Sequence, residues 1–427
     1  MKLFQQMLVA SAAIGLIAPI GAQANDINIE SMNSYSRSNS SSKKQQFNSK
    51  SFANELATVN DKIDGLESQF NDFEAGGFSD TTTMDGKAVF SIGALDADDS
   101  ITALNENTVF QYMYVMNLNS SFTGDDNLYV RIKTGNGPKD ANGDKTLPFN
   151  ETAYGTYLSS ANQNGDGLKV DKLWYTMPLG DSFTFTAGPK IENYYMHGTT
   201  PSIYKPVLKQ FTLGGNASAY GASTSPGAGL TWTGDSGLAI STNFTTQKGN
   251  STGILTDKKT SWATQIGYTQ PRYSVSAIAN IKSNGWSDSY YKAGDINGDA
   301  TSTDSYTAVG LRGWWRPENT GTATPSISVG YDTTEYDASS GQEQADAWFV
   351  GLNWQDIFTP DDRIGAAFGQ PTTNESSDVD PFAYEVYYSF KPNDSMTITP
   401  TFFGGSDRNG TAAGDITGAV LETTFKF

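Results

Sequence analysis

Short segments in which apolar and polar residues alternate fill the sequence from Thr81 to the C-terminus. In residues 127–133, with the sequence NLYVRIK, aliphatic side chains alternate with Tyr129, Arg131 and Lys133. Such alternation places one set of side chains on each face of an extended strand. About sixteen segments show it, namely 87–93, 110–119, 127–133, 172–179, 183–187, 227–233, 238–244, 262–268, 273–281, 307–315, 326–331, 348–354, 363–368, 382–390, 396–399 and 419–427. The pattern predicts an all-β fold.

The connections between these segments alternate between two lengths. Short turns, such as 179–181 and 234–237, are followed by long stretches rich in Gly, Asn, Asp and Ser, such as 135–167 and 189–225. Strands that run up and down around a barrel give this order, with turns at one rim and loops at the other. A Greek-key sandwich, the alternative for alternating strands, gives no reason for it.

The polar faces of the segments carry charged residues. These residues are Arg131, Lys133, Lys172, Arg312, Glu385, Glu422 and Lys426. They point away from the apolar face, so the inside of the barrel must be wet, and a barrel of about sixteen strands is wide enough for an aqueous channel. We therefore predict an all-β membrane protein: an antiparallel transmembrane β-barrel of about 16 strands over residues 77–427, preceded by a short periplasmic coiled-coil helix.

Composition narrows the functional classes. The 427 residues include no Cys, which excludes disulfide scaffolds, thiolate metal sites and Cys nucleophiles. The formal net charge is −18, which argues against nucleic acid as the main partner because phosphate binding needs a concentrated basic surface. His197 is the one His of the chain, so it would have to serve alone in a catalytic or metal site. A plain loop residue is the simpler interpretation.

The first 50 residues have the features of export and linker segments. Residues 1–24 combine Lys2, an apolar run at 7–20 and a small-residue site before Asn25, which predicts a cleaved signal peptide. The apolar run is shorter than the about 20 residues that a spanning helix needs. Residues 25–50 are rich in Ser, Asn and Gln and predict a flexible solvated linker. The alternative is a cationic contact with an anionic cell-wall polymer, peptidoglycan.

A heptad pattern follows the linker at 51–76. Its apolar seam is spaced alternately by four and three residues and consists of Phe52, Leu56, Val59, Ile63, Leu66, Phe70 and Phe73. A helix of this length is marginal on its own, so the seam is predicted to pack against copies of itself. Packing against the mouth of the barrel is the alternative, because any apolar partner satisfies an amphipathic stripe.

Several motifs carry a resemblance to a known family. They are FANELATV at 52–59, IDGLE at 63–67, GFSDTTTMDG at 77–86, LWYTMPLGD at 173–181 and Gly188-Pro189. They resemble cyanobacterial outer-membrane porins of the OprB-like, carbohydrate-selective family, some members of which are labelled iron-uptake porins. Relatives usually carry a cell-wall-binding S-layer-homology domain before the coiled coil, and here the Ser/Asn linker stands in its place. The C-terminal Phe427 resembles the terminal aromatic signal read by the outer-membrane assembly machinery.

The resemblance implies a passive channel in the outer-membrane lipid, assembled as a homotrimer. It would carry small hydrophilic solutes: inorganic ions, iron species or carbohydrates. In many porins the third long loop folds inward and narrows the pore. The predicted constriction therefore comprises Lys190, Glu192, Tyr194, Tyr195, Tyr204, Lys205 and Lys209, with Arg131, Lys133 and Lys172 on the facing wall. Charged rings of this kind set ion preference. Acidic loops would also bridge through divalent cations to lipopolysaccharide.

Two other functions fit the sequence. A plugged barrel would serve only as a structural tether for the coiled coil, and an outer-membrane hydrolase would need His197 beside a Ser. Three loop segments beginning at Asp140, Asn162 and Asp295 resemble the start of a calcium loop, but none completes it. The sequence therefore predicts a porin that is not an enzyme and holds no metal or cofactor.

Overall fold

The computed structural model describes most of the chain after residue 76. Within 77–427 the positions outside the described residues are 80, 100, 103, 137–146, 151–154, 163, 216–217, 222–223, 248–252, 254–258, 287–304, 338–343, 375–378 and 408–413. The predicted signal peptide, linker and coiled coil also lie outside the described residues, as do the calcium-like segments 140–144 and 295–299. The barrel belongs to the unit Phe78–Phe427.

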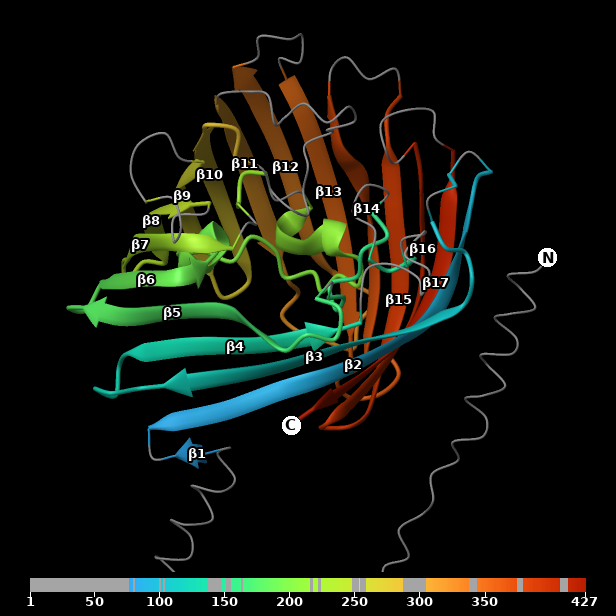
Figure 1. The fold of residues 1–427 in the computed structure, drawn as a ribbon, viewed down its shortest axis with the longest axis horizontal. Helices are drawn as coiled ribbons and strands as arrows, with labels where there is room; N and C mark the ends of the chain where they lie inside the picture. Colours follow the sequence, from blue (N-terminus) through green and yellow to red (C-terminus); the bar gives the residue numbers. More distant parts are fainter. Residues whose placement is uncertain are drawn as a thin grey trace, which may run out of the picture. The chain divides into compact units, whose positions relative to one another are not determined.

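Sixteen antiparallel strands close into one barrel (Figure 1). A short strand, β1 (Gly77–Ser79), precedes them. Their bounds are β2 (Thr82–Ala97), β3 (Val109–Ser120), β4 (Asn127–Gly135), β5 (Lys169–Leu179), β6 (Phe183–Ile191), β7 (Ser225–Thr233), β8 (Leu238–Thr246), β9 (Thr260–Gln270), β10 (Tyr273–Ser283), β11 (Ser305–Trp315), β12 (Ser326–Asp337), β13 (Gln344–Gln355), β14 (Arg363–Asn374), β15 (Phe382–Asn393), β16 (Met396–Ser406) and β17 (Ile416–Lys426). Each strand pairs with the next, and β17 returns to β2 with Ile416 opposite Ala97. The predicted barrel and its number of strands are confirmed.

The burial pattern of the strands is the inverse of that in a soluble protein. On β9, Trp262 and Ile266 are 57% and 51% exposed, whereas the alternating Ser261 and Gln265 are 0% and 1% exposed. A large apolar surface of this kind requires an apolar surrounding, and a closed barrel satisfies the backbone hydrogen bonds of its strands there. The outer surface therefore fits a lipid bilayer, while the inner surface is polar.

The C-terminal residue takes part in closing the barrel. The Phe427 N–H donates to Gly86 O at 3.1 Å, and the Gly86 N–H donates to Phe427 O at 2.8 Å. The Phe427 ring stacks on Tyr114 with the ring centres 5.8 Å apart. A Cβ atom on Gly86 would lie 2.5 Å from the Phe427 ring, so this seam requires glycine. The role of Phe427 as an assembly signal stays a prediction.

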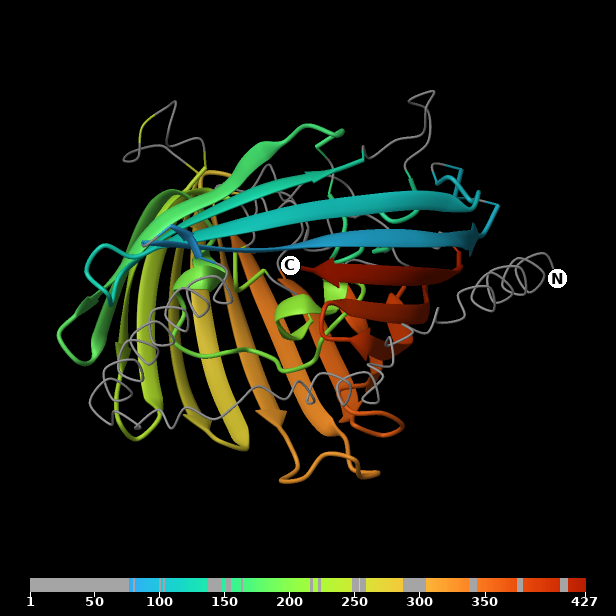
Figure 2. The same cartoon turned by 90° about the horizontal axis from the view of Figure 1, so that it is seen from below.

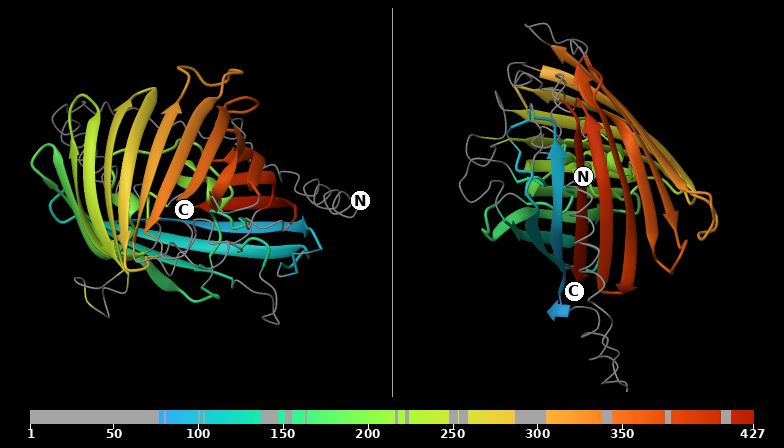
Figure 3. Two further views of the ribbon diagram at one scale, coloured as in Figure 1. Left: turned by 90° about the horizontal axis from the view of Figure 1, so that it is seen from above. Right: turned by 90° about the vertical axis from the view of Figure 1, so that its right-hand side faces the viewer.

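The connections differ at the two rims, as the alternation of lengths predicts. One rim carries seven turns, of which 316–325 is the longest and 271–272 is among the shortest. The opposite rim carries the longest connections, although three of its connections are shorter than 316–325, namely 338–343, 375–381 and 407–415. The described parts of the two longest, the β4–β5 loop (136–168) and the β6–β7 loop (192–224), run inside the ring of strands (Figures 2 and 3).

Two short helices of the β6–β7 loop lie inside the barrel (Figure 2). η2 (Asn193–Met196) packs against β7, β8 and β9, and η3 (Lys209–Gly214) packs against β12 and β13. The loop thus crosses the lumen from one wall to another. Among the described residues, no helix is both long enough and apolar enough to cross a membrane.

Candidate functional site

Three irregularities in strand register gather around β4, β5 and β6. The register shifts after Arg131 between β4 and β5, after Leu173 between β5 and β6, and after Gly188 between β6 and β7. At the first shift Asp171 is left unpaired beside Lys172, which lies opposite Arg131. Asp171 and Lys172 therefore both point into the lumen, because a bulge re-aims the side chains around it. In a regular strand, two consecutive side chains point to opposite faces.

Charged side chains at these bulges contact the β6–β7 loop. Arg131 binds Asp171 through Nε at 2.6 Å and also through Nη2, and its Nη1 donates to Tyr195 Oη at 3.2 Å. Lys172 Nζ donates to Glu192 Oε1 at 2.8 Å. The Lys172 side chain is 2% exposed, a burial that Lys tolerates only when it is paired. These predicted constriction residues are therefore brought together.

Lys133 and Lys209 complete a group that we call the basic cluster. Lys133 Nζ donates to a carbonyl of the β4–β5 loop at 3.3 Å. Lys209 begins η3, where burial and the cations Lys172 and Arg131 lower the pKa of its ammonium despite the opposing effect of Glu192. The cluster comprises Arg131, Lys133, Lys172 and Lys209 with the acids Asp171 and Glu192. Positive charge is in excess here, although the chain as a whole has a net charge of −18.

A row of aromatic rings, each tilted against the next, borders the basic cluster. The ring centres of Tyr129 and Trp174 are 4.3 Å apart, and those of Trp174 and Tyr195 are 4.7 Å apart. Tyr194 continues the row at 4.3 Å from Tyr195, which is 36% exposed. Tyr194 and Tyr195 belong to the predicted constriction, whereas Tyr129 and Trp174 were missed. Tyr129 could have been predicted as a lumen residue, because it lies on the same strand face as Arg131.

Three predicted constriction residues lie apart from the basic cluster. Lys190 is exposed, and its Nζ donates to a carbonyl of β5 at 2.8 Å. Lys205 is exposed, and its backbone N–H donates to Asn353 Oδ1 on β13 at 3.2 Å. Tyr204 is buried against β15, where its hydroxyl donates to Glu385 at 2.7 Å. The structure therefore places Tyr204 and Lys205 at a second wall of the lumen.

Glu385 of β15 holds the middle of the β6–β7 loop at this second wall. Its Oε2 accepts the Leu208 N–H at 2.7 Å, and its Oε1 accepts the Val207 N–H at 3.2 Å besides the Tyr204 hydroxyl. The Glu385 side chain has no exposed surface. A buried carboxylate needs such donors, so the loop and Glu385 stabilise each other. Alternation predicts Glu385 on the polar face, but its role as an anchor was missed.

The β4–β5 loop pairs with the β6–β7 loop inside the barrel. Leu158 forms an antiparallel bridge with Leu208, and Ser160 Oγ donates to Glu422 of β17. An apolar cluster joins both loops to the wall and includes Phe149, Tyr157, Tyr204, Val207, Phe211, Phe349, Tyr387 and Phe403. The sequence predicted one inward loop, and the second was missed.

Wall residues also hold the end of the β6–β7 loop. Arg312 of β11 donates from Nε to Leu213 O at 2.8 Å and pairs through Nη2 with Asp332 of β12 at 2.6 Å. Asn280 of β10 donates to Ala219 O at 3.1 Å. Polar residues of several strands thus fix the loop across the lumen.

His197 lies beside Ser241, and among the described residues no carboxylate bonds to its ring. His197 Nδ1 is 3.2 Å from Ser241 Oγ and 3.2 Å from Asn243 Nδ2. Its Nε2 is buried and has no hydrogen-bond partner among the described residues, whereas a catalytic triad places an acid on the second ring nitrogen. Ser241 is 1% exposed. The geometry fits a neutral structural ring.

Acid is expected to loosen the packing of His197 and the start of the β6–β7 loop. Burial lowers the pKa of His197 to about 3, against about 6.5 for an exposed ring. Between these values the opened loop binds a proton that the packed loop does not, so stability is complete above about pH 6.5 and falls toward pH 3. At pH 4.5 the expected loss is about 2–3 kcal/mol. Amide hydrogen exchange of loop peptides, corrected for its intrinsic pH dependence, measures this loss.

The matched control for this prediction is His197→Gln. Glutamine keeps a polar side chain at the position and does not titrate between pH 7 and pH 4. The protection of the loop amides should then be independent of pH over this range. The same acid-dependent loss in both proteins would assign it to another group.

The described residues that face the lumen include groups that can contact a small polar solute. Among the described residues, no group of three or more His, Asp or Glu side chains is placed to hold a metal ion. Charged side chains, carbonyl groups and aromatic faces bind small polar molecules weakly enough to release them, which conduction requires.

Comparisons with known proteins agree with this architecture. Residues 38–427 match the family described as "Carbohydrate-selective porin, OprB family". The structure of Pseudomonas putida OprB at high pH is similar, with a TM-score of 0.59 and 11% identity, over 81% of this chain and 94% of that chain. At this low identity the similarity concerns the fold.

Two uncharacterized proteins are similar in sequence. One from Synechocystis sp. is 25% identical over 402 residues, covering 82% of this chain and 70% of the relative. One from Nostoc sp. is 30% identical over 169 residues, covering 39% of this chain. The match spans only 28% of the length of the Nostoc protein.

Proposed function

The chain belongs to the carbohydrate-selective porin family OprB, and we propose that it forms a water-filled channel of the outer membrane through which small hydrophilic solutes diffuse passively. One observation carries this proposal: a closed barrel whose outside is apolar and whose charged inside is narrowed by two loops. Diffusion down a gradient requires weak contacts with the solute and no chemical reaction.

The basic cluster and the aromatic row form the constriction of this channel. Both lie on the wall of β4 and β5, where the β6–β7 loop turns into the lumen. Fixed cations attract anions and repel cations in a narrow, partly dehydrated passage. The excess of positive charge therefore gives the constriction a preference for anions.

Carbohydrates are the solute class that the aromatic row favours. The exposed parts of the Trp174 and Tyr195 rings can contact the apolar C–H face of a sugar ring. Arg131 and Asp171, directly beside them, supply N–H donors and carboxylate oxygens for the sugar hydroxyls. Inorganic ions pass through the same channel at rates that depend on their size and charge.

The assembly that we propose is a homotrimer surrounded by outer-membrane lipid and lipopolysaccharide. The heptad seam from Phe52 to Phe73 supports a periplasmic coiled coil at 51–76. The signal peptide 1–24 is removed on export. The linker 25–50, with its excess of cations, is the segment that would contact peptidoglycan.

Planar-bilayer recording separates a channel from a structural tether with a plugged barrel. The purified protein should show open-channel current, and glucose should interrupt that current. Trp174→Ala should weaken the interruption by about threefold to tenfold, because a stacking surface is lost, while the current without sugar persists. Trp262→Ala is the matched control, since Trp262 lies on the outer face of the barrel. A barrel that conducts no current would contradict the proposed channel.

A further inference from the structure

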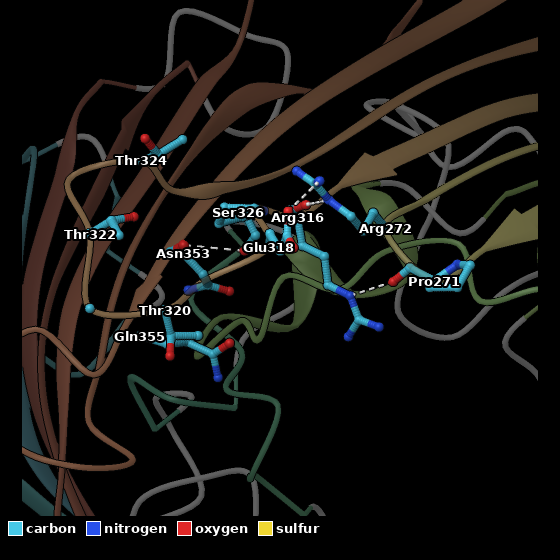
Figure 4. Close-up of a pocket in the computed structure, with 12 residues that line it drawn as sticks. Pro271, Arg272, Arg316, Glu318, Thr320, Thr322, Thr324, Ser326, Asn353 and Gln355 are labelled. Carbon is cyan, nitrogen blue, oxygen red and sulfur yellow. Dashed lines mark hydrogen bonds and ion pairs between the residues drawn. The ribbon is translucent and has the colours of Figure 1, made fainter.

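The longest connection of the turn rim borders a half-open pocket lined by charged, polar and proline residues (Figure 4). The pocket has a volume of about 320 Å³ and lies between the connection 316–325, the turn 271–272 and the ends of β12 and β13. Two residues suffice to join neighbouring antiparallel strands, as the turn 271–272 shows. The additional residues of 316–325 build the wall of the pocket.

Hydrogen bonds to both neighbours hold this connection in place. The Arg316 N–H donates to Arg272 O at 2.9 Å, and the Gly321 N–H donates to a carbonyl at the end of β13 at 2.8 Å. The indole of Trp354 donates to Ala323 O at 2.8 Å. The pocket is therefore preformed, which lowers the entropy cost of binding.

Two arginines line one side of the pocket, and they differ in what they bind. Arg272 Nη1 lies 3.3 Å from Glu318 Oε2, so its charge is paired. Arg316 donates from Nε to Pro271 O at 2.7 Å, and its guanidinium lies 5.9 Å from the ring centre of Trp314. The two terminal amino groups of Arg316 have no hydrogen-bond partner among the described residues. They remain available to a ligand.

The pocket carries a net positive charge, with two arginines against Glu318, whereas the other turns of this rim carry acids. Arg272 and Arg316 are the only cations within the seven turns, all of which the structure describes. The acids of the turns are Asp125, Asp126, Asp181, Asp235, Glu318, Asp356, Asp361, Asp362 and Asp394. Within the turns, an anion is therefore attracted to the arginine pair and repelled by the acids of the other turns.

We propose that this pocket binds the phosphate group of a small hydroxylated solute, such as a sugar phosphate. The fork of amino groups on Arg316 matches two phosphate oxygens. Thr320, Thr322 and the Gln355 amide line the rest of the pocket and can bond the hydroxyls of the solute. The volume reaches the lower end of the range of about 300–1,000 Å³ that small-molecule sites occupy. The site is separate from the proposed constriction and goes beyond the passive passage of solutes.

Titration calorimetry of the full-length protein in detergent, with glucose 6-phosphate as the probe, tests this site. Arg316→Gln should weaken binding by about tenfold or more, because a charge-assisted pair of hydrogen bonds is lost. The affinity of Arg316→Lys should lie between those of Arg316→Gln and the unchanged protein. Lys391→Gln is the control, since it removes a cation at the end of β15 that Asp361 already pairs at 2.8 Å. Its binding should equal that of the unchanged protein.

Several outcomes would overturn the site. Equal affinity in Arg316→Gln and the unchanged protein excludes Arg316, and equal affinity for glucose excludes recognition of phosphate. Equal affinity for inorganic phosphate excludes a role for the hydroxylated body. The variant Arg131→Gln with Lys133→Gln should retain the binding that depends on Arg316. Loss of binding in that variant would place the anion in the lumen and overturn the rim site, while leaving the channel itself untouched.

Discussion

The double variant Arg131→Glu with Lys133→Glu is expected to change the channel from a preference for anions to a preference for cations. Each replacement exchanges a cation for a carboxylate, so the basic cluster changes from an excess of cations to an excess of acids. Two unit charges 4 Å apart interact by about 1 kcal/mol in bulk water, and more where water is partly excluded. The ratio of anion to cation permeability should therefore fall by about tenfold or more. Reversal potentials across a salt gradient measure this ratio.

A charge reversal outside the lumen provides the control. Lys391 pairs with Asp361 at 2.8 Å and with Asp394 at 3.3 Å at the turn rim. Lys391→Glu therefore makes the same change of charge per replaced residue at the turn rim and not in the predicted constriction, and the permeability ratio should stay near that of the unchanged protein. If the double variant conducts normally but its ratio is also unmoved, Arg131 and Lys133 do not line the narrowest part of the channel.

The barrel could be predicted from the sequence because each strand face meets a single environment. On β9, every second residue faces the polar lumen and the residues between them, such as Trp262 and Ile266, face outward. This constraint is local, so it appears as a pattern in consecutive residues. The alternation of short turns and long loops adds the order of the strands.

Strand alternation fails at the part of the wall where the candidate site lies. Asp171 and Lys172 are consecutive, so regular alternation would place them on opposite faces, yet both bind groups in the lumen. The bulge that brings them together is a property of paired strands and leaves little trace in either strand alone. One trace does exist, since Gly188 and Pro189 inside a strand are typical of an irregular register.

The pairing of the two loops could not be predicted for a different reason. Leu158 and Leu208 are bridged although they are far apart in the sequence, and the loops that carry them have no periodic pattern. Their positions depend on wall groups such as Glu385 and Glu422. Buried carboxylates of this kind become informative only when their partners are known.

The variant Glu385→Ala is expected to release the middle of the β6–β7 loop and to raise the single-channel conductance. The N–H groups of Val207 and Leu208 and the hydroxyl of Tyr204 lose their acceptor together. Each buried donor left unpaired costs about 1–3 kcal/mol, so the loop loses more than about 3 kcal/mol of its attachment. A loop that is released from the wall fills less of the lumen, so the open cross-section increases. Larger currents with frequent changes of level should follow, together with faster hydrogen exchange of the amides at 203–209.

Two milder variants show whether such an effect comes from the anchor itself. Tyr204→Phe removes one of the three donors, whereas Glu385→Gln keeps one acceptor oxygen and turns an N–H₂ group toward the remaining donors. Conductance and exchange should therefore increase from Tyr204→Phe through Glu385→Gln to Glu385→Ala. General destabilisation of β15 would change both Glu385 variants but leave Tyr204→Phe like the unchanged protein. Unchanged current and exchange in Glu385→Ala would show that the apolar cluster around Phe349 alone holds the loop in place.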